Sequence, residues 1–230
     1  MQRIRTNRLL EALPVEESAG LRRYGHEVDL IANSVLHEAG RLLEHVYFPH
    51  TGLTSLLAVM PNGAIAEAGF IGCEGAIGTS YDDVDRTSFA RAIVCVGENA
   101  LRVSIDVFEN FMSRSVNFRR LISQNNNRMA ERSQQIAACN LLHQLESRVC
   151  RWLLQVLENS EDANVVITQD SLAHMLGVTR ARLNGALGTL HHLHAVEQTR
   201  RGTLKVIDAN IIAQRACDCF LVLHGPLTKE

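Results

Sequence analysis

The spacing of hydrophobic residues changes near residue 105, and this change divides the chain into two parts. Before it, short apolar or alternating runs are separated by turns that contain glycine or proline, a pattern typical of antiparallel strands in a sandwich or barrel. The predicted strands are Glu44–Phe48, Leu53–Met60, Ala64–Ile71 and Phe89–Val96. Asn7 is a suitable N-cap for a short helix that ends before Pro14.

After residue 105 the hydrophobic residues follow a helical period. They predict a helix of about 30 residues without a break, in which the apolar side chains are mostly seven residues apart: Phe111, Phe118, Ile122, Met129 and Ile136. So long a helix needs a partner, either the chain's own barrel or the same helix of a second chain. Asn125 favours the second chain, because a polar seam residue commonly sets the register of a dimer. We therefore predict a homodimer interface of Phe118, Ile122, Asn125, Met129 and Ile136.

A further amphipathic helix is predicted over Leu141–Glu158, and a loop follows it. After the short strand Val165–Ile167, Thr168 is a good N-cap for a helix over Gln169–Leu176. Gly177-Val178 forms a turn, and Thr179 caps the next helix, whose buried stripe is Leu183, Leu187 and Leu190. Two capped helices joined by a short glycine turn are the arrangement of a helix-turn-helix.

The segment after this helix pair predicts a basic β-hairpin, or wing, with its turn at Arg201-Gly202. The whole chain has a formal net charge of −2. From Thr179 to Val206, however, five basic residues oppose the single acid Glu197: Arg180, Arg182, Arg200, Arg201 and Lys205. Local clustering of positive charge, rather than overall charge, is the signature of a DNA contact.

The exposed face of the second helix predicts how DNA is read. Arg180 and Asn184 flank the small residues at its centre, and they suit contacts with guanine and adenine respectively. Arg182, Arg200, Arg201 and Lys205 are expected to neutralise phosphates. Thr168 and Thr179 complete the predicted DNA-binding residues. A pair of packed helices with solvated arginines is the alternative interpretation, and the N-caps and the basic wing count against it.

Together these segments resemble the Crp/Fnr superfamily of transcription regulators over nearly the whole chain. The segments that carry the resemblance are Val46–Gly52, Gly69–Gly75, Ala137–Asn140 and Ile167–Leu190. The resemblance implies an α+β chain in three parts: a jelly-roll-like antiparallel β-roll of the cyclic-nucleotide-binding type (1–110), a dimerisation helix (111–140) and a winged helix-turn-helix (141–230). The family's DNA-reading arginine corresponds to Arg180. Its other two readers are replaced by Ala181 and Gly185, so the preferred DNA sequence should differ.

The ligand pocket that the family implies departs from the cyclic-AMP pattern. Its positions correspond to Gly72, Cys73, Glu74, Ser88, Phe89, Ser133 and Gln134. The glutamate is one place late, and the arginine that would hold the phosphate is absent, while Arg86 and Arg91 are out of register. A buried phosphate without an arginine lacks its strongest partner. We therefore expect an effector other than cyclic AMP bound in the usual way.

Other chemistry is not supported by the residue spacing. The six cysteines and the histidines of the β-region lack the spacing of a metal site, so we expect no metal, cofactor or catalytic residue. The expected partners are a palindromic double-stranded DNA operator, a second copy of the chain, RNA polymerase and an unidentified small-molecule effector, in the cytoplasm and without a membrane. Two alternatives stay open: a small-molecule-binding or cyclic-nucleotide-binding module, and a barrel-type metal enzyme, each without DNA activity.

Overall fold

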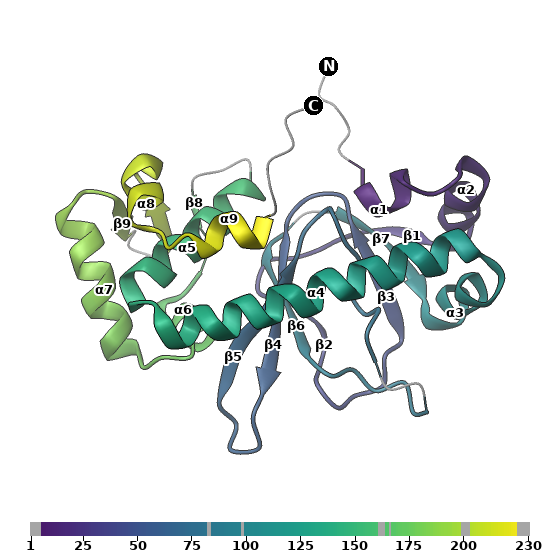
Figure 1. Ribbon diagram of the computed structural model, residues 1–230, viewed down its shortest axis with the longest axis horizontal. Helices are drawn as coiled ribbons and strands as arrows, with labels where there is room; N and C mark the ends of the chain where they lie inside the picture. Colours follow the sequence, from purple (N-terminus) through teal and green to yellow (C-terminus); the bar gives the residue numbers. More distant parts are fainter. Residues whose placement is uncertain are drawn as a thin grey trace. The chain divides into compact units, whose positions relative to one another are not determined.

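The computed structural model describes residues 6–81, 84–97, 99–160, 164–165, 167–198 and 203–224. The chain divides into two compact units. The first unit comprises Met1–Val59 and Phe70–Ala130, and the second comprises Met60–Gly69 and Glu131–Glu230. Sheets with flanking helices and a helical C-terminal region, drawn in Figure 1, confirm the α+β class.

Two sheets form the framework of the β-roll, and the pairs β1–β7, β3–β7, β2–β6 and β4–β6 are antiparallel. One has the order β1-β7-β3 and the other the order β2-β6-β4-β5. Their strands are β1 (His26–Asp29), β2 (Val35–His37), β3 (His45–Pro49), β4 (Leu53–Val59), β5 (Ile65–Ile71), β6 (Arg91–Val96) and β7 (Asn99–Ser104). The four predicted strands are confirmed with shifted ends. Strands β1, β2 and β7 were not among the predicted strands. Polar β1 and three-residue β2 carry no extended alternation of apolar residues.

The N-terminal helix is α1 (Arg8–Glu11), and Asn7 caps it as predicted. The Asn7 side chain accepts hydrogen bonds from the backbone N–H groups of Leu9 and Leu10. Its amide also donates to the carbonyls of Pro49 and Gly75, at 2.8 Å each. Asn7 is fully buried, so these bonds satisfy a polar group that water does not reach. A second helix, α2 (Val15–Tyr24), was not predicted.

The long helix is shorter than predicted, because the chain breaks at Ser115. Helix α3 (Ile105–Arg114) ends there, and α4 runs separately over Val116–Leu142. The Ser115 hydroxyl accepts a hydrogen bond from the N–H of Phe118 at 2.9 Å, in the manner of an N-cap. Phe111 therefore belongs to α3, and the predicted helix over 111–140 begins only at Val116.

The first half of α4 packs against its own unit. Phe118 and Ile122 are at most 1% exposed, and both lie in the hydrophobic core that includes Phe48 and Phe108. The Phe118 ring lies 5.5 Å from that of Phe108, centre to centre, in an edge-to-face arrangement. Side chains enclosed within one chain cannot form a seam with another. The dimer-interface interpretation of Phe118 and Ile122 was therefore wrong.

The hydrogen bonds of the buried Asn125 side chain also lie within the first unit. Its side-chain oxygen accepts from the N–H of Ala76, and its amide donates to the Thr79 hydroxyl at 3.0 Å. A Cβ atom at Gly75 would lie only 2.5 Å from this oxygen, so Gly75 gives the space for the asparagine. Asn125 fixes the helix on the β-roll of its own chain, and the prediction that it sets a dimer register was wrong.

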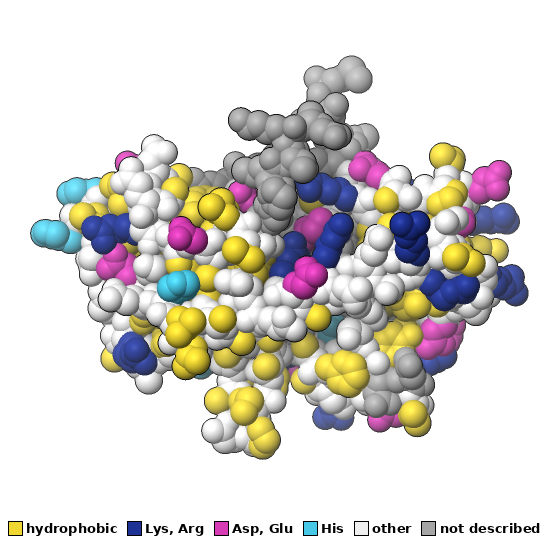
Figure 2. Space-filling model, viewed as in Figure 1, with side chains coloured by type: hydrophobic (Ala, Val, Ile, Leu, Met, Phe, Trp, Pro, Cys, Tyr) yellow, Lys and Arg dark blue, Asp and Glu magenta, His cyan; other side chains and the backbone are white. Residues whose placement is uncertain are grey.

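Of the other two predicted seam residues, Ile136 is buried within the chain, whereas the interface role of half-buried Met129 stays a prediction. Met129 is half-buried against the second core cluster of the β-roll, and Ile136 is 1% exposed in the second unit. The exposed face of α4 carries a different set of side chains, which includes Ala130, Ala137, Ala138, Leu141 and Leu142. Figure 2 shows hydrophobic side chains along this face, over the C-terminal half of α4.

The second unit consists mainly of helices with a three-stranded sheet of order β8-β10-β9. Its elements after α4 are α5 (Leu145–Glu158), β8 (Asn164–Val165), α6 (Gln169–Met175), α7 (Arg180–His192), β9 (Val196–Gln198), β10 (Leu204–Val206), α8 (Ala209–Arg215) and α9 (Cys219–His224). Helix α5 begins at Leu145 rather than at the predicted Leu141. Among the described residues, no helix combines the length and apolarity needed to cross a membrane.

Candidate nucleic-acid interface

Helices α6 and α7 form the predicted helix-turn-helix, and their ends are fixed by the predicted caps. The Thr168 hydroxyl accepts from the N–H of Ser171 at 3.1 Å, and the Thr179 hydroxyl accepts from that of Arg182 at 3.4 Å. Between the helices, Gly177 has a φ of +63°, a backbone conformation that glycine adopts without strain. The helix boundaries and the turn therefore follow from local sequence.

One face of α7 is buried and holds the helix in place. Leu183, Leu187 and Leu190 are at most 3% exposed, as the stripe predicted, and Leu172 and Leu176 of the preceding segment are also buried. Burying a leucine side chain contributes roughly 1.5–3 kcal/mol. The leucine stripe thus fixes which side of α7 faces outward.

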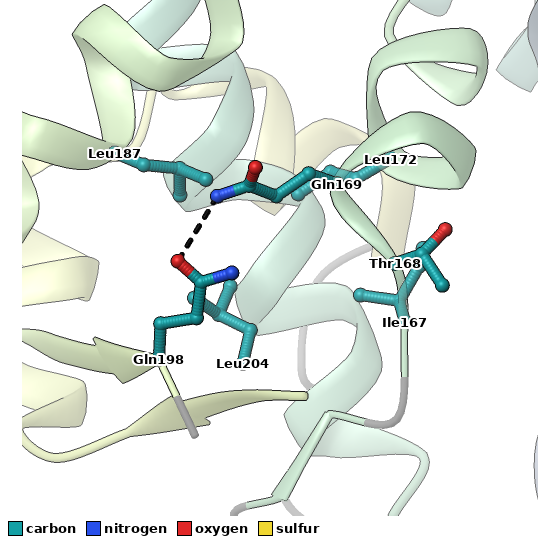
Figure 3. Close-up of a pocket in the computed structure, with 7 residues that line it drawn as sticks. All are labelled: Ile167, Thr168, Gln169, Leu172, Leu187, Gln198 and Leu204. Carbon is teal, nitrogen blue, oxygen red and sulfur yellow. Dashed lines mark hydrogen bonds between the residues drawn. The ribbon is translucent and has the colours of Figure 1, made fainter. Parts of the chain in front are cut away.

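The wing is a β-hairpin packed beside α6. Strands β9 and β10 pair antiparallel, with Leu204 opposite Gln198. The Gln169 side chain of α6 donates to the Gln198 side chain at 3.1 Å, and both residues line a small pocket together with Leu172, Leu187 and Leu204 (Figure 3). This bond joins the start of the helix-turn-helix to the wing, and no pattern in the sequence indicated it. The turn of the hairpin lies outside the described residues, as do the predicted phosphate contacts Arg200 and Arg201.

The remaining predicted DNA-binding side chains lie at the surface. The exposed set is Thr168, Thr179, Arg180, Arg182, Asn184 and Lys205. Arg180 forms an ion pair with Asp170 of α6 at 3.3 Å, and both side chains are about 60% exposed. An exposed pair of this kind contributes little to stability. Arg180 can therefore exchange Asp170 for another partner at small cost.

Two glycines lie at the centre of the exposed face of α7. Among the described residues, a Cβ atom at Gly185 or at Gly188 would meet no atom within 4 Å other than its own helix's nearby backbone. Packing within the chain therefore does not require glycine at either position, although each costs the helix about 1 kcal/mol relative to alanine. A close approach of another molecule to this face would explain them.

We predict opposite effects of Gly188→Ala on stability and on DNA binding. The free energy of unfolding should rise by up to about 1 kcal/mol, because alanine is the better helix former and has free space. DNA affinity should fall if this face enters the groove, because the added methyl group would stand between the helix and the bases. Denaturant unfolding and DNA titration of the same samples measure both effects. Unchanged affinity in Gly185→Ala and Gly188→Ala alike would contradict a close approach of this face.

Arg148 is a buried residue of α5 that sequence reasoning missed. Its guanidinium donates to the carbonyl of Leu176 at the end of the first helix of the motif, and to the Asn140 side chain of α4 at 3.1 Å. Burial lowers the pKa of Arg148 from its usual value. Arg148 therefore links the end of α4 to the turn of the helix-turn-helix within the second unit.

The predicted effector-pocket residues are distributed over both units. Gly72, Cys73 and Glu74 lie in the turn after β5, where the Glu74 carboxylate accepts from the N–H of Gly72. The Ser88 hydroxyl donates to the carbonyl of Ala90, and Phe89 is 63% exposed. Ser133 and Gln134 lie on α4 in the second unit. The pocket assignment stays a prediction.

The two arginines nearest the predicted phosphate position are engaged with carboxylates. Arg86 pairs with Asp106 and Glu109 of α3, and Arg91 pairs with Glu38 at 2.5 Å. A phosphate would have to displace these carboxylates to recruit either arginine.

One cluster of metal-binding side chains was also missed. The ligand atoms of Cys139, His143, Cys217 and Cys219 all lie within 4.8 Å of one another. Two signals for it are present in the sequence: Cys139 and His143 are one helical turn apart, and Cys217 and Cys219 are separated by one residue. The 74-residue separation between the two pairs concealed the cluster, because only the fold brings them together.

Comparison with known proteins agrees with this geometry. The model of the Crp-like helix-turn-helix domain matches residues 147–214. A protein from Eubacterium rectale assigned to the crp/fnr family of transcriptional regulators superposes with a TM-score of 0.70 at 11% identity, over 90% of this chain and 96% of that chain. FixK2 from Bradyrhizobium japonicum has a TM-score of 0.66 at 13% identity, over 84% and 98% of the respective chains. No curated protein matches the sequence.

A CRP-family transcriptional regulator from Thermus thermophilus is similar to the same extent, with a TM-score of 0.66 and 14% identity over 82% of this chain and 96% of that chain. These identities establish the fold alone, while the domain match identifies the helix-turn-helix. Residues 147–214 match a Crp-like helix-turn-helix domain, and the chain shares its fold with regulators of the crp/fnr family.

Proposed function

We propose that the protein binds a specific, roughly palindromic double-stranded DNA site as a homodimer and regulates transcription there. The main support for the proposal is that one face of α7 is apolar and buried, while the opposite face is basic and exposed. Its leucines are buried, while Arg180, Arg182 and Asn184 are exposed on a helix that Thr179 caps. A helix anchored on one side and basic on the other fits the major groove.

These side chains would have two different roles in binding DNA. Arg180 and Asn184 read base edges, since a guanidinium pairs with guanine and a carboxamide with adenine. Arg182 and Lys205, together with Arg200 and Arg201 in the wing, neutralise phosphates and so set the position of the protein on the duplex. The open space at Gly185 and Gly188 supports a close approach of this helix to the base edges.

A second copy of the chain is the partner that fits the exposed face of α4. Leu141 and Leu142 are 84% and 75% exposed, and alanines precede them on the helix. Small residues let two helices approach closely, and exposed leucines gain stability when a partner covers them. Two paired chains would present two α7 helices to half-sites about one helical turn apart, near 34 Å.

The β-roll senses an effector other than cyclic AMP bound in the usual way. Support comes from Arg86 and Arg91, which are paired with carboxylates and so are not poised to receive a phosphate. The effector would shift an existing equilibrium between orientations of the DNA-binding domains. RNA polymerase is the further partner that this class of protein predicts.

Selection of bound sequences from a random DNA pool, followed by a salt titration, tests the proposal. We expect a palindromic consensus with half-sites about one helical turn apart. Affinity should fall steeply with salt, because each neutralised phosphate releases a counterion and contributes about −0.9 to the slope of log K against log salt. No consensus together with a flat salt response would contradict DNA binding and favour a ligand-binding module.

A further inference from the structure

Four side chains from two distant segments of the second unit meet at the end of α4. Cys139 and His143 come from that end, and Cys217 and Cys219 come from the junction of α8 and α9. The sulfurs of Cys139 and Cys217 are 3.6 Å apart, and the Cys219 sulfur is 3.4 Å from Nδ1 of His143. The three cysteines are buried, and His143 is exposed.

These distances match the edges of a tetrahedron around one metal ion. With zinc–sulfur bonds of about 2.3 Å, tetrahedral geometry places two sulfur ligands about 3.8 Å apart, and a sulfur and a nitrogen slightly closer. An iron–sulfur cluster would hold its ligands farther apart, because they bind different iron atoms. A disulfide requires about 2.05 Å between sulfurs, much less than the separation of Cys139 and Cys217.

The backbone and a neighbouring side chain support the arrangement. The N–H of His143 donates to the carbonyl of Cys139 at 3.1 Å, so the two side chains lie one helical turn apart on the same face. The Gln135 amide of α4 donates to the Cys219 sulfur at 3.1 Å. A donor of this kind orients a thiolate ligand and stabilises its charge.

The buried charges near the cluster also suit a negatively charged metal site. The guanidiniums of Arg148 and Arg151 are buried in the same unit, and that of Arg148 donates to Asn140, the residue after Cys139. Glu67 forms an ion pair with Arg151 in the same unit at 3.9 Å. Two buried cations and one buried anion leave one positive charge, which is costly unless it is balanced. Three thiolates and a neutral imidazole around Zn²⁺ carry one negative charge.

We propose that Cys139, His143, Cys217 and Cys219 bind a single structural Zn²⁺ ion. Zinc prefers thiolate and imidazole ligands in this tetrahedral arrangement. The ion would fasten the junction of α8 and α9 to the end of α4, beside the arginine that reaches the helix-turn-helix. It would therefore stabilise the second unit whether or not that unit is bound to DNA. The exposed imidazole of His143 gives the ion access from solvent.

Metal analysis of the full chain, purified without chelator, is the first test. We expect about one zinc per chain, with release of the metal by a thiol-blocking mercurial and a lower melting temperature afterwards. Replacement of zinc by Co²⁺ should give the intense d–d absorption of a tetrahedral site together with thiolate-to-cobalt charge transfer. No bound zinc and no such Co²⁺ spectrum would overturn the proposal.

Variants identify the ligands. Cys217→Ser should lose the bound metal, whereas Cys150→Ala, which changes another buried cysteine of the same unit, should keep it. If Cys217→Ser does not fold, His143→Ala tests the metal site instead, because replacing an exposed side chain should not prevent folding. It should bind Co²⁺ more weakly, with a shifted absorption spectrum. An unchanged spectrum in His143→Ala, or a disulfide between Cys139 and Cys217 found by mass spectrometry of the native chain, would overturn the site.

Discussion

Arg180→Ala should strongly weaken the preference for the operator while leaving the fold intact, if Arg180 reads a base as proposed. A bidentate contact with guanine discriminates by about 1–3 kcal/mol. A dimer makes this contact twice, so the specific affinity should fall by about 2–6 kcal/mol, or roughly 30-fold to 10⁴-fold. The exposed ion pair with Asp170 contributes little, so the melting temperature should change little.

Arg182→Ala is the matched control, because it removes the same charge from the next exposed arginine of α7. Its loss should weaken binding to all sequences alike and lower the salt slope by about one per chain. The measurement is titration of each variant with the selected operator and with a scrambled duplex at several salt concentrations. If Arg180→Ala weakened both duplexes equally, Arg180 would be a phosphate contact, and base reading would have to be assigned elsewhere.

The second large effect is expected at Phe118. Phe118→Ala should destabilise the first unit by about 3–5 kcal/mol, because it leaves a cavity among packed aromatic rings. Three such rings, those of Phe48, Phe108 and Phe111, lie within 6.4 Å of Phe118, centre to centre. Since this core belongs to one chain, the loss should not depend on protein concentration. Denaturant unfolding at several concentrations measures it.

Leu141→Arg is the contrasting substitution on the same helix. Leu141 is 84% exposed, so the stability of each unit should hardly change, while a dimer that buries this face should dissociate. Sedimentation analysis of both variants separates the two expectations. A Phe118→Ala chain that folded normally but became monomeric would restore the seam interpretation and contradict the packing described above.

The helix-turn-helix was predictable from sequence because its determinants are local. The threonine caps, the glycine turn and the leucine stripe act between residues a few positions apart. The exposure of Arg180, Arg182 and Asn184 followed from the helical period once the buried stripe was known. The bond between Gln169 and Gln198 was not predictable, because neither residue carries a pattern that points to the other.

The wrong prediction that the apolar stripe of α4 packs against a second chain also has a physical cause. A regular apolar stripe shows that one face of a helix is buried, but it does not show against what. The spacing of Phe118, Ile122 and Asn125 is consistent both with a second chain and with the chain's own β-roll. The contacts of Asn125 with Ala76 and Thr79 decide for the β-roll. The break at Ser115 was missed because no glycine or proline marks it.

By itself, the sequence determined the class of the fold, the ends of the helix pair and the side of α7 that carries charge. Each of these depends on hydrogen bonds and hydrophobic spacing within a short segment. The tertiary structure alone decided which surface of α4 is free, how Arg148 reaches the helix-turn-helix, and that two distant pairs of residues meet at one point. Such contacts join residues far apart in the chain, and a periodic pattern contains no information about its partner.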